Sequence, residues 1–249
     1  MYVIFNADDF GLTPGVNLGI VEACRKGVVR STTLMVGMPA EQQAIALAHQ
    51  EPRLKVGLHL RFTLGKPLTA APSLVGDDGL FFRGERFWAQ RGFSRQQVAD
   101  EVIAQLEAFM ASGLQLSHVD SHHHAHSHPE ILPVVAEIVR DYRVPLRASG
   151  HQDGVSPACR YMFEHHFYGS DLNVDGLVEL IQRHRGQCDV LEVMTHPAYV
   201  DQALLDISSY HVERANELAI LTAPELIEAL AALDIQITDF SVLAEKYHR

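Results

Sequence analysis

The chain opens with Tyr2-Val3-Ile4-Phe5-Asn6-Ala7-Asp8-Asp9-Phe10-Gly11, four apolar residues followed by a polar stretch. Branched and aromatic side chains in a short run are typical of a buried strand, and the polar residues that follow predict a turn at its carboxyl end. Thr13 and Pro14 then supply the cap and first turn of a helix, and Gly27 ends it. The opening residues therefore predict a strand, an acidic turn and a helix.

The same order of strand and helix repeats along the chain. Further strands are predicted at 32–36, 55–60, 116–119, 145–147, 190–194 and 235–238, with a weaker one near 163–167; further helices are predicted at 40–49, 94–113, 129–139, 174–185, 210–221 and 224–233. Repeated βα units imply parallel strands under helical cover. The sequence thus predicts a single α/β domain over 1–249, either a closed barrel or a doubly wound sheet, with a loop excursion at about 61–92.

Composition and charge exclude several classes of partner. The net charge is −11 and the basic residues are scattered singly, which argues against nucleic acid. The three cysteines form no CxxC pair, as expected in a reducing compartment. The N-terminus lacks the basic region of a signal peptide, and no apolar run approaches the ~18 residues of a membrane span. We therefore expect a cytoplasmic protein with neither nucleic acid nor membrane as partner.

Polar residues capable of metal or acid–base chemistry follow the predicted strands at their carboxyl ends. They are Asp8 and Asp9, His59, Asp120 and His122, Arg147, and His196. In parallel α/β folds these strand ends carry the functional sites, and in a barrel they converge in space. The chain also holds 15 histidines against one tryptophan, and the histidines are clustered. This clustering invites a metal-site hypothesis.

A hydrolytic metal site needs about three imidazole or carboxylate ligands and a position left open for water. Asp9, His59 and His122 meet that number from three different strands. Asp8 is then the candidate base that takes a proton from water, and His196 the candidate acid that protonates the departing amine. Arg147 is a candidate for orienting Asp8 or holding its charge.

Each of these residue patterns also has a purely structural interpretation, without any role in chemistry. Two consecutive aspartates are often a turn or cap device, and a lone histidine such as His59 is often a satisfied core residue. The run His122-His123-His124-Ala125-His126 leaves a second ligand open, because His122 and His124 share a side if the run is extended, and His122 and His126 if it is helical. The joint occurrence of these residues at strand ends favours the metal site.

Four motifs carry a family resemblance: Asn6-Ala7-Asp8-Asp9-Phe10-Gly11, Gly57-Leu58-His59, Asp120-Ser121-His122-His123-His124-Ala125-His126 and Thr195-His196-Pro197. With these motifs the chain resembles the YdjC-like carbohydrate deacetylases, and within them the bacterial chitooligosaccharide deacetylases. The resemblance runs nearly end to end. It implies a TIM-like (β/α) barrel of the polysaccharide-deacetylase type, distorted or seven-stranded.

The resemblance also implies a reaction, the removal of one N-acetyl group from diacetylchitobiose or a related short N-acetylglucosamine oligosaccharide. Carried over by residue, Asp9, His59 and His122 would hold one divalent ion, Asp8 would be the base and His196 the acid, with Arg147 matched by position only. Magnesium is the metal implied by the family, whereas two imidazoles and a carboxylate suit zinc at least as well.

Two other functions fit the same residues. One is a metal-dependent deacylase of another acylated amino sugar or related small molecule, and the other is a non-catalytic domain that binds metal or sugar. No sequence feature indicates an oligomeric state, so a homodimer is the default expectation. The expected partner is a small oligosaccharide substrate.

Overall fold

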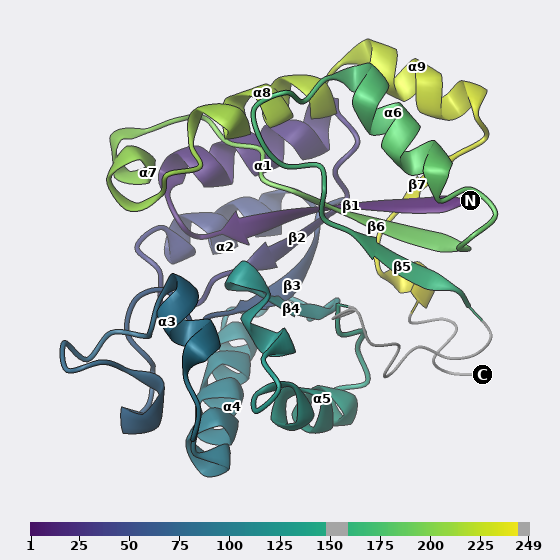
Figure 1. The fold of residues 1–249 in the computed structure, drawn as a ribbon. Coiled ribbons are helices and arrows are strands. Elements are labelled where there is room, and N and C mark those ends of the chain that lie inside the picture. The colour runs from purple at the N-terminus through teal and green to yellow at the C-terminus, as the bar shows by residue number, and fades with distance from the viewer. Residues whose placement is uncertain (148–158, 244–249) are drawn as a thin grey trace.

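The computed structural model describes residues 1–147 and 159–243, and a sheet of seven parallel strands forms its centre (Figure 1). The strands are β1 (Tyr2–Phe10), β2 (Ser31–Leu34), β3 (Lys55–Leu60), β4 (Val119–Ser121), β5 (Tyr161–Glu164), β6 (Val190–Thr195) and β7 (Gln236–Thr238). Their spatial order is β4-β3-β2-β1-β6-β5, and β7 pairs with β1. All these pairings are parallel, as the repeated βα units predicted.

Helices cover the sheet on its outer side. They are α1 (Pro14–Lys26), α2 (Glu41–Gln50), α3 (Gly84–Ala89), α4 (Arg95–Ala111), α5 (Leu132–Asp141), α6 (Val174–Arg183), α7 (Gln202–Ile207), α8 (Val212–Leu221) and α9 (Pro224–Ala232), with 3₁₀ turns η1 (Pro72–Leu74) and η2 (His122–Ser127). In Figure 1, α1 and α8 lie above the sheet and α4 and α5 below it. No helix within the described ranges is both long and apolar enough to cross a membrane.

Strand β1 is the central element and is longer than the sequence predicted. Its partners are β6 on one side, and β2 and β7 on the other. Val3, Ile4 and Phe5 have no exposed surface, as is typical of a parallel strand covered on both faces. The expected turn after Phe5 is wrong, because β2 and β6 continue to pair with the polar residues and extend the strand to Phe10.

The sheet is a half-barrel in which no closure is seen between the described residues. The strand predicted at 145–147 is reduced to a single parallel bridge between Val119 and Leu146, next to β4. The opposite end of the strand order is β5, and the intervening residues 148–158 lie outside the described ranges. The expectation of a parallel α/β fold is confirmed, whereas a complete TIM barrel is not.

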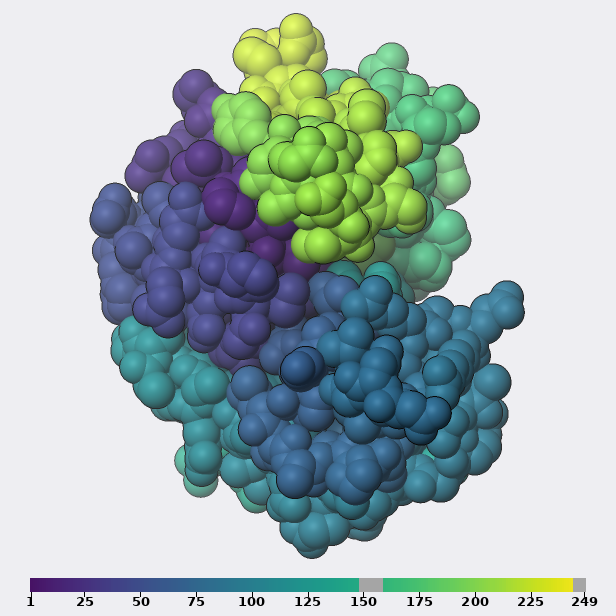
Figure 2. Space-filling view, turned by 90° about the vertical axis from the view of Figure 1, so that its left-hand side faces the viewer, coloured from purple at the N-terminus to yellow at the C-terminus, as the bar shows by residue number. Residues whose placement is uncertain are grey.

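The excursion at about 61–92 packs against α4 and is held there by hydrogen bonds. Glu101 of α4 is buried and accepts hydrogen bonds from the backbone N–H groups of Leu68 and Thr69 at 3.0 Å. Arg61 is buried as well and donates to the carbonyls of Leu64 and Lys66. Figure 2 shows the excursion, in blue, facing the yellow-green segment around α7 across a hollow. The hydrogen bonds made by Glu101 and Arg61 therefore fix the position of one side of this hollow.

Candidate active site

A pocket of about 410 Å³ lies at the carboxyl ends of the strands. The excursion contributes Thr63, Leu64 and Arg83 to its lining, and the segment after α7 contributes Ser208, Ser209 and Tyr210. Asp8, Asp9, His59, His122 and His196 also line it. The pocket thus collects groups from strands that are far apart in sequence, as the strand-end pattern predicted.

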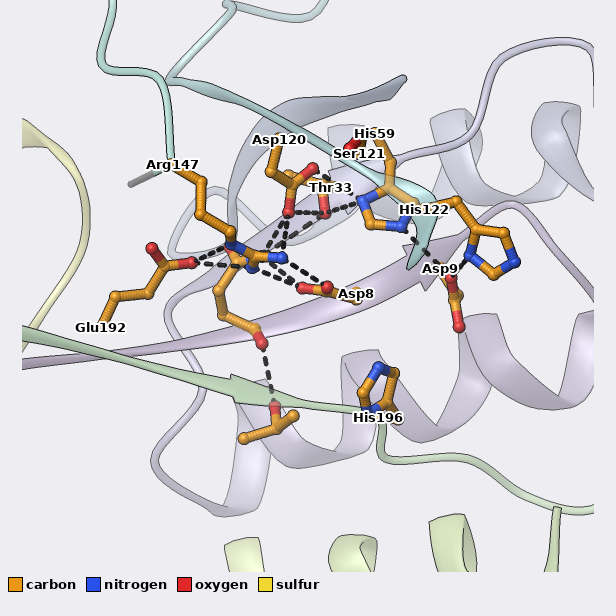
Figure 3. A network of polar contacts seen from close by, with 12 residues as sticks. Asp8, Asp9, Thr33, His59, Asp120, Ser121, His122, Arg147, Glu192 and His196 are labelled. Atoms are coloured by element: carbon orange, nitrogen blue, oxygen red, sulfur yellow. Dashed lines mark hydrogen bonds and ion pairs between the residues drawn. The ribbon is translucent and has the colours of Figure 1, made fainter. Parts of the chain in front are cut away.

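One carboxylate and two imidazoles meet on the pocket floor (Figure 3). Oδ1 of Asp9 lies 2.9 Å from Nδ1 of His122 and 3.3 Å from Nε2 of His59. One donor atom from each of the three residues lies within 4.8 Å of the others, and all three are buried. The structure therefore brings the three sequence-predicted metal ligands together.

The backbone of β1 explains how two consecutive aspartates reach one pocket. Neighbouring side chains of a regular strand point to opposite faces of the sheet. At Asp9 the backbone has φ 73, and the register with β2 shifts between Ala7 and Phe10. A non-glycine residue in this left-handed region is uncommon and marks a local departure from strand geometry. This irregularity lets Asp8 and Asp9 line the same cavity.

Asp120 orients His59 from the side opposite Asp9. Its Oδ1 lies 2.6 Å from Nδ1 of His59, and the Thr33 hydroxyl donates to its Oδ2 at 3.1 Å. Burial alone would lower the pKa of His59, but the charge and hydrogen bond of Asp120 prevail and raise it to about 10. A carboxylate behind a ligand imidazole fixes the ring's orientation and directs its other nitrogen toward the metal position.

Arg147 holds Asp8 in a two-pronged ion pair. Nη1 and Nη2 donate to Oδ2 and Oδ1 of Asp8 at 2.6 and 2.7 Å. Arg147 also lies 2.9 Å from Asp120 and donates to Glu192 at 2.7 Å. Burial opposes ionisation of Asp8, but the guanidinium outweighs it and holds the pKa of this carboxyl below its usual range. Asp8 is therefore an oriented carboxylate beside the cluster of Asp9, His59 and His122.

The buried network can accept a cation in place of a proton. Among the described residues, the carboxylates of Asp8, Asp9 and Asp120 pair with the guanidinium groups of Arg147 and Arg214, and Glu192 also contacts Arg147. The raised pKa of His59 adds a positive charge to the network, and a divalent ion bound at this imidazole would replace that proton. An overlapping set, Asp8, His59 and Asp120, also has its donor atoms close together. Arg147 already forms ion pairs with the carboxylates of Asp8 and Asp120. The set around Asp9 therefore fits an ion better.

His196 faces the cluster from the end of β6 (Figure 3). Glu217 of α8 accepts a hydrogen bond from its backbone N–H, and Oε1 of Glu217 lies 3.7 Å from Nδ1 of its ring. The same oxygen accepts a hydrogen bond of 2.6 Å from the Tyr210 hydroxyl. The ring of Tyr168 stacks on Tyr210 at 4.0 Å and meets His196 edge-on. An acid–base group and an aromatic surface thus lie next to each other in the pocket.

The histidine run adopts neither of the two geometries considered from the sequence. His123 and His124 have φ 54 and 55, so the backbone turns left-handed immediately after His122. His126 points to Ser121, with Nδ1 2.5 Å from the hydroxyl, and its other nitrogen lies 3.2 Å from the carbonyl of Arg147. His124 lines the pocket. The cluster around Asp9 includes neither His124 nor His126.

Sequence reasoning missed the residues that support the site from the second half of the chain. Arg214 donates to Oδ2 of Asp9 at 2.7 Å, and Glu217 holds His196. Both are buried on α8, where a charged pair three residues apart looks like an ordinary solvated helix face. Glu192 interrupts the apolar strand β6, and this was the one signal that could have been used.

Comparison with known proteins gives a family match over most of the chain. The family model described as YdjC-like protein matches residues 2–232. A protein of Vibrio vulnificus (strain CMCP6) named carbohydrate deacetylase is 53% identical over 243 residues, which are 98% of this chain and 96% of that protein. The motifs at the strand ends are therefore part of an end-to-end similarity.

Two solved structures are similar in fold. A protein of Enterococcus faecalis V583, described as a candidate cellobiose-phosphate cleavage protein, has a TM-score of 0.88 and 32% identity, with 97% of this chain and 98% of that chain covered. A family 4 carbohydrate esterase from Streptomyces lividans, in complex with acetate, has a TM-score of 0.51 and 14% identity, with 94% and 90% covered. The second likeness extends only to the parallel-strand half-barrel.

Proposed function

Because the chain belongs to the YdjC-like protein family, we propose that it is a metal-dependent carbohydrate deacetylase. The observation that carries the proposal is the contact of Asp9 with His59 and His122 on the floor of a pocket that also holds Asp8 and His196. The relatives' name, carbohydrate deacetylase, supports the class of reaction. We propose short N-acetylglucosamine oligosaccharides such as diacetylchitobiose as substrates, and acetate and a free amino sugar as products.

Asp9, His59 and His122 would hold the divalent ion. When bound, such an ion supplies Lewis-acid polarisation of the acetamide carbonyl and lowers the pKa of water. Two imidazoles and one carboxylate are a donor set that zinc accepts readily, whereas magnesium prefers oxygen ligands. The donor set therefore favours zinc or a similar transition ion.

Asp8 accepts the proton of the attacking water in this proposal. A base must be ionised and within reach of the reacting atoms, and Asp8 is held ionised at the edge of the pocket. Arg147 fixes both carboxylate oxygens, while its charge is shared with Asp120 and Glu192. These contacts hold both oxygens of Asp8 in one orientation.

His196 delivers a proton to the nitrogen of the breaking amide bond. An amine leaves poorly as an anion, so the reaction needs an acid on the leaving-group side. Glu217 accepts a hydrogen bond from the backbone N–H of His196 and its Oε1 lies 3.7 Å from Nδ1, so it fixes the position of the ring beside the pocket. Asp8 and His196 are thus a base and an acid in one pocket.

The pocket also supports a sugar as substrate. Its volume of about 410 Å³ lies in the usual range of small-molecule sites. Tyr168 is 52% exposed and lines the pocket, where its ring offers an apolar face. Stacked and edge-on aromatic surfaces of this kind bury the apolar face of a ligand ring.

Acetate release tests the proposal. We expect the zinc-loaded protein to liberate acetate from diacetylchitobiose and to leave a product lighter by one acetyl group. A panel of other N-acylated amines, assayed in parallel, separates a sugar deacetylase from a broader deacylase. The matched control is Asp9→Asn, which removes one ligand charge and should abolish both metal binding at this centre and acetate release. A metal-loaded protein that releases no acetate from any N-acetylated sugar would refute the proposed function.

A further inference from the structure

We propose a second transition-metal site, formed by Glu164, His165 and His166 at the carboxyl end of β5. It is separate from the centre around Asp9 and does not depend on the reaction proposed above. Within the described ranges, three groups of residues place metal-ligating atoms within 4.8 Å of one another. Two of these groups share His59 and belong to the site already described, and the third is this one.

The set of donor groups is the same as at the first centre. Oε1 of Glu164 lies 2.6 Å from Nδ1 of His166 and accepts a hydrogen bond of 2.7 Å from the backbone N–H of the same residue. The ring of His165 stacks on that of His166, with centroids 4.2 Å apart. One carboxylate and two imidazoles therefore meet here, as they do at Asp9, but on a different strand.

A fourth residue holds the carboxylate from behind. Nε2 of His184, which follows α6, lies 2.8 Å from Oε2 of Glu164. Glu164 is nearly buried, with 7% of its side chain exposed. A buried carboxylate with Oε2 fixed by His184 and Oε1 in contact with His166 has the arrangement of a metal ligand with an outer-sphere partner. His184 is therefore a positioning residue and not a ligand.

The ligands are open to solvent on the other side. His165 and His166 are both exposed, so an ion can reach the site without a change in the fold. His165 also lines the substrate pocket, where its ring lies 6.3 Å from that of His124. The site therefore lies at the rim of the pocket. Its two imidazoles select a late first-row ion such as Zn²⁺, Ni²⁺ or Cu²⁺ over Mg²⁺.

Calorimetric titration of the chelator-stripped full chain with ZnCl₂ tests the site. The test variant is His166→Gln, an exposed substitution with little risk to folding. The matched control is His49→Gln, an exposed histidine on α2 that is remote from the cluster in sequence. We expect His166→Gln to bind one equivalent of zinc fewer than the wild type, or to bind it at least tenfold more weakly, and His49→Gln to bind as the wild type does.

The wild type and both variants keep the centre around Asp9, so a difference in zinc binding between them reports on the second site alone. If His166→Gln and the wild type bind zinc with the same stoichiometry and affinity, the second site does not exist. A loss of the same size in His49→Gln would show nonspecific binding to surface histidines and would also overturn the proposal. A parallel titration with MgCl₂ should show no difference between His166→Gln and the wild type, because Mg²⁺ disfavours this donor set.

Discussion

Arg214 of α8 binds Asp9 of β1, with Nη2 2.7 Å from Oδ2, although 205 positions separate the two residues. The contact leaves Oδ1 of Asp9 to His59 and His122. It also lowers the pKa of Asp9 against the effect of burial, so the carboxylate stays charged. The helix thereby selects which oxygen of Asp9 faces His59 and His122, a detail that no feature of β1 alone specifies.

Asp8→Asn should separate base catalysis from metal binding. We expect turnover of diacetylchitobiose to fall on the order of 10²- to 10⁴-fold, the usual contribution of a positioned base. Metal content should stay unchanged, because Asp9, His59 and His122 are intact. Steady-state acetate release and elemental analysis of the same preparation check the two parts. Full activity would remove Asp8 from the mechanism, and lost metal would make it a ligand.

His196→Asn should affect substrates according to their leaving group. We expect deacetylation of the amino sugar to fall on the order of 10²- to 10⁴-fold, because the amine needs a proton to depart. Hydrolysis of p-nitrophenyl acetate should fall much less, since nitrophenolate leaves without one. The measurement is the ratio of the two kcat values. An equal loss on both substrates would contradict an acid role for His196.

Arg147→Met should destabilise the fold. The substitution leaves three buried carboxylates, those of Asp8, Asp120 and Glu192, without their shared guanidinium. Removing one partner of a buried ion pair costs about 3–5 kcal/mol in free energy of unfolding. The matched control is Arg95→Met, whose exposed pair with Glu137 should contribute at most about 1 kcal/mol. Urea unfolding of both variants checks the prediction, and equal losses would refute it.

Glu192 should make stability depend on pH. Burial raises the pKa of this carboxyl from 4.5 to about 7, despite the hydrogen bonds from Arg147 and Tyr161. Between these values the folded chain holds a proton that the unfolded chain releases, so the free energy of unfolding falls as pH rises. The wild type should lose up to about 1.4 kcal/mol per pH unit relative to Glu192→Gln over this window. The free energy of unfolding of both proteins is measured by urea unfolding at several pH values. The same dependence on pH in the two proteins would contradict the raised pKa.

Tyr168→Ala should weaken sugar binding and leave chemistry nearly intact. The exposed ring stacks on Tyr210 and meets His196 edge-on. An aromatic contact contributes about 0.5–1.5 kcal/mol, which corresponds to a 2- to 12-fold rise in KM for diacetylchitobiose. The control is Tyr142→Ala, an exposed tyrosine that follows α5. An unchanged KM in Tyr168→Ala would exclude a sugar contact at this ring.

The parallel fold could be predicted because its signals are local. Apolar runs such as Val190–Thr195 and capped helices such as Pro14–Lys26 lie where the residue pattern indicates. The end of β1 could not be predicted, because hydrogen bonds from β2 and β6, not the polarity of Asp8 and Asp9, decide how far the strand runs. Barrel closure is equally nonlocal, since it depends on which strands become neighbours.

The sequence alone predicts that five side chains meet at one edge of the sheet, because each follows a predicted strand and parallel strands bring such ends together. The structure places all five in one pocket: Asp8, Asp9, His59, His122 and His196. The orientations within the pocket could not be predicted. The left-handed backbone at Asp9, the turn after His122, and the contacts made by Arg214 and Glu217 arise when elements far apart in sequence pack together. Strand-end position follows from local pattern, whereas side-chain direction and charge pairing follow from packing over long sequence separations.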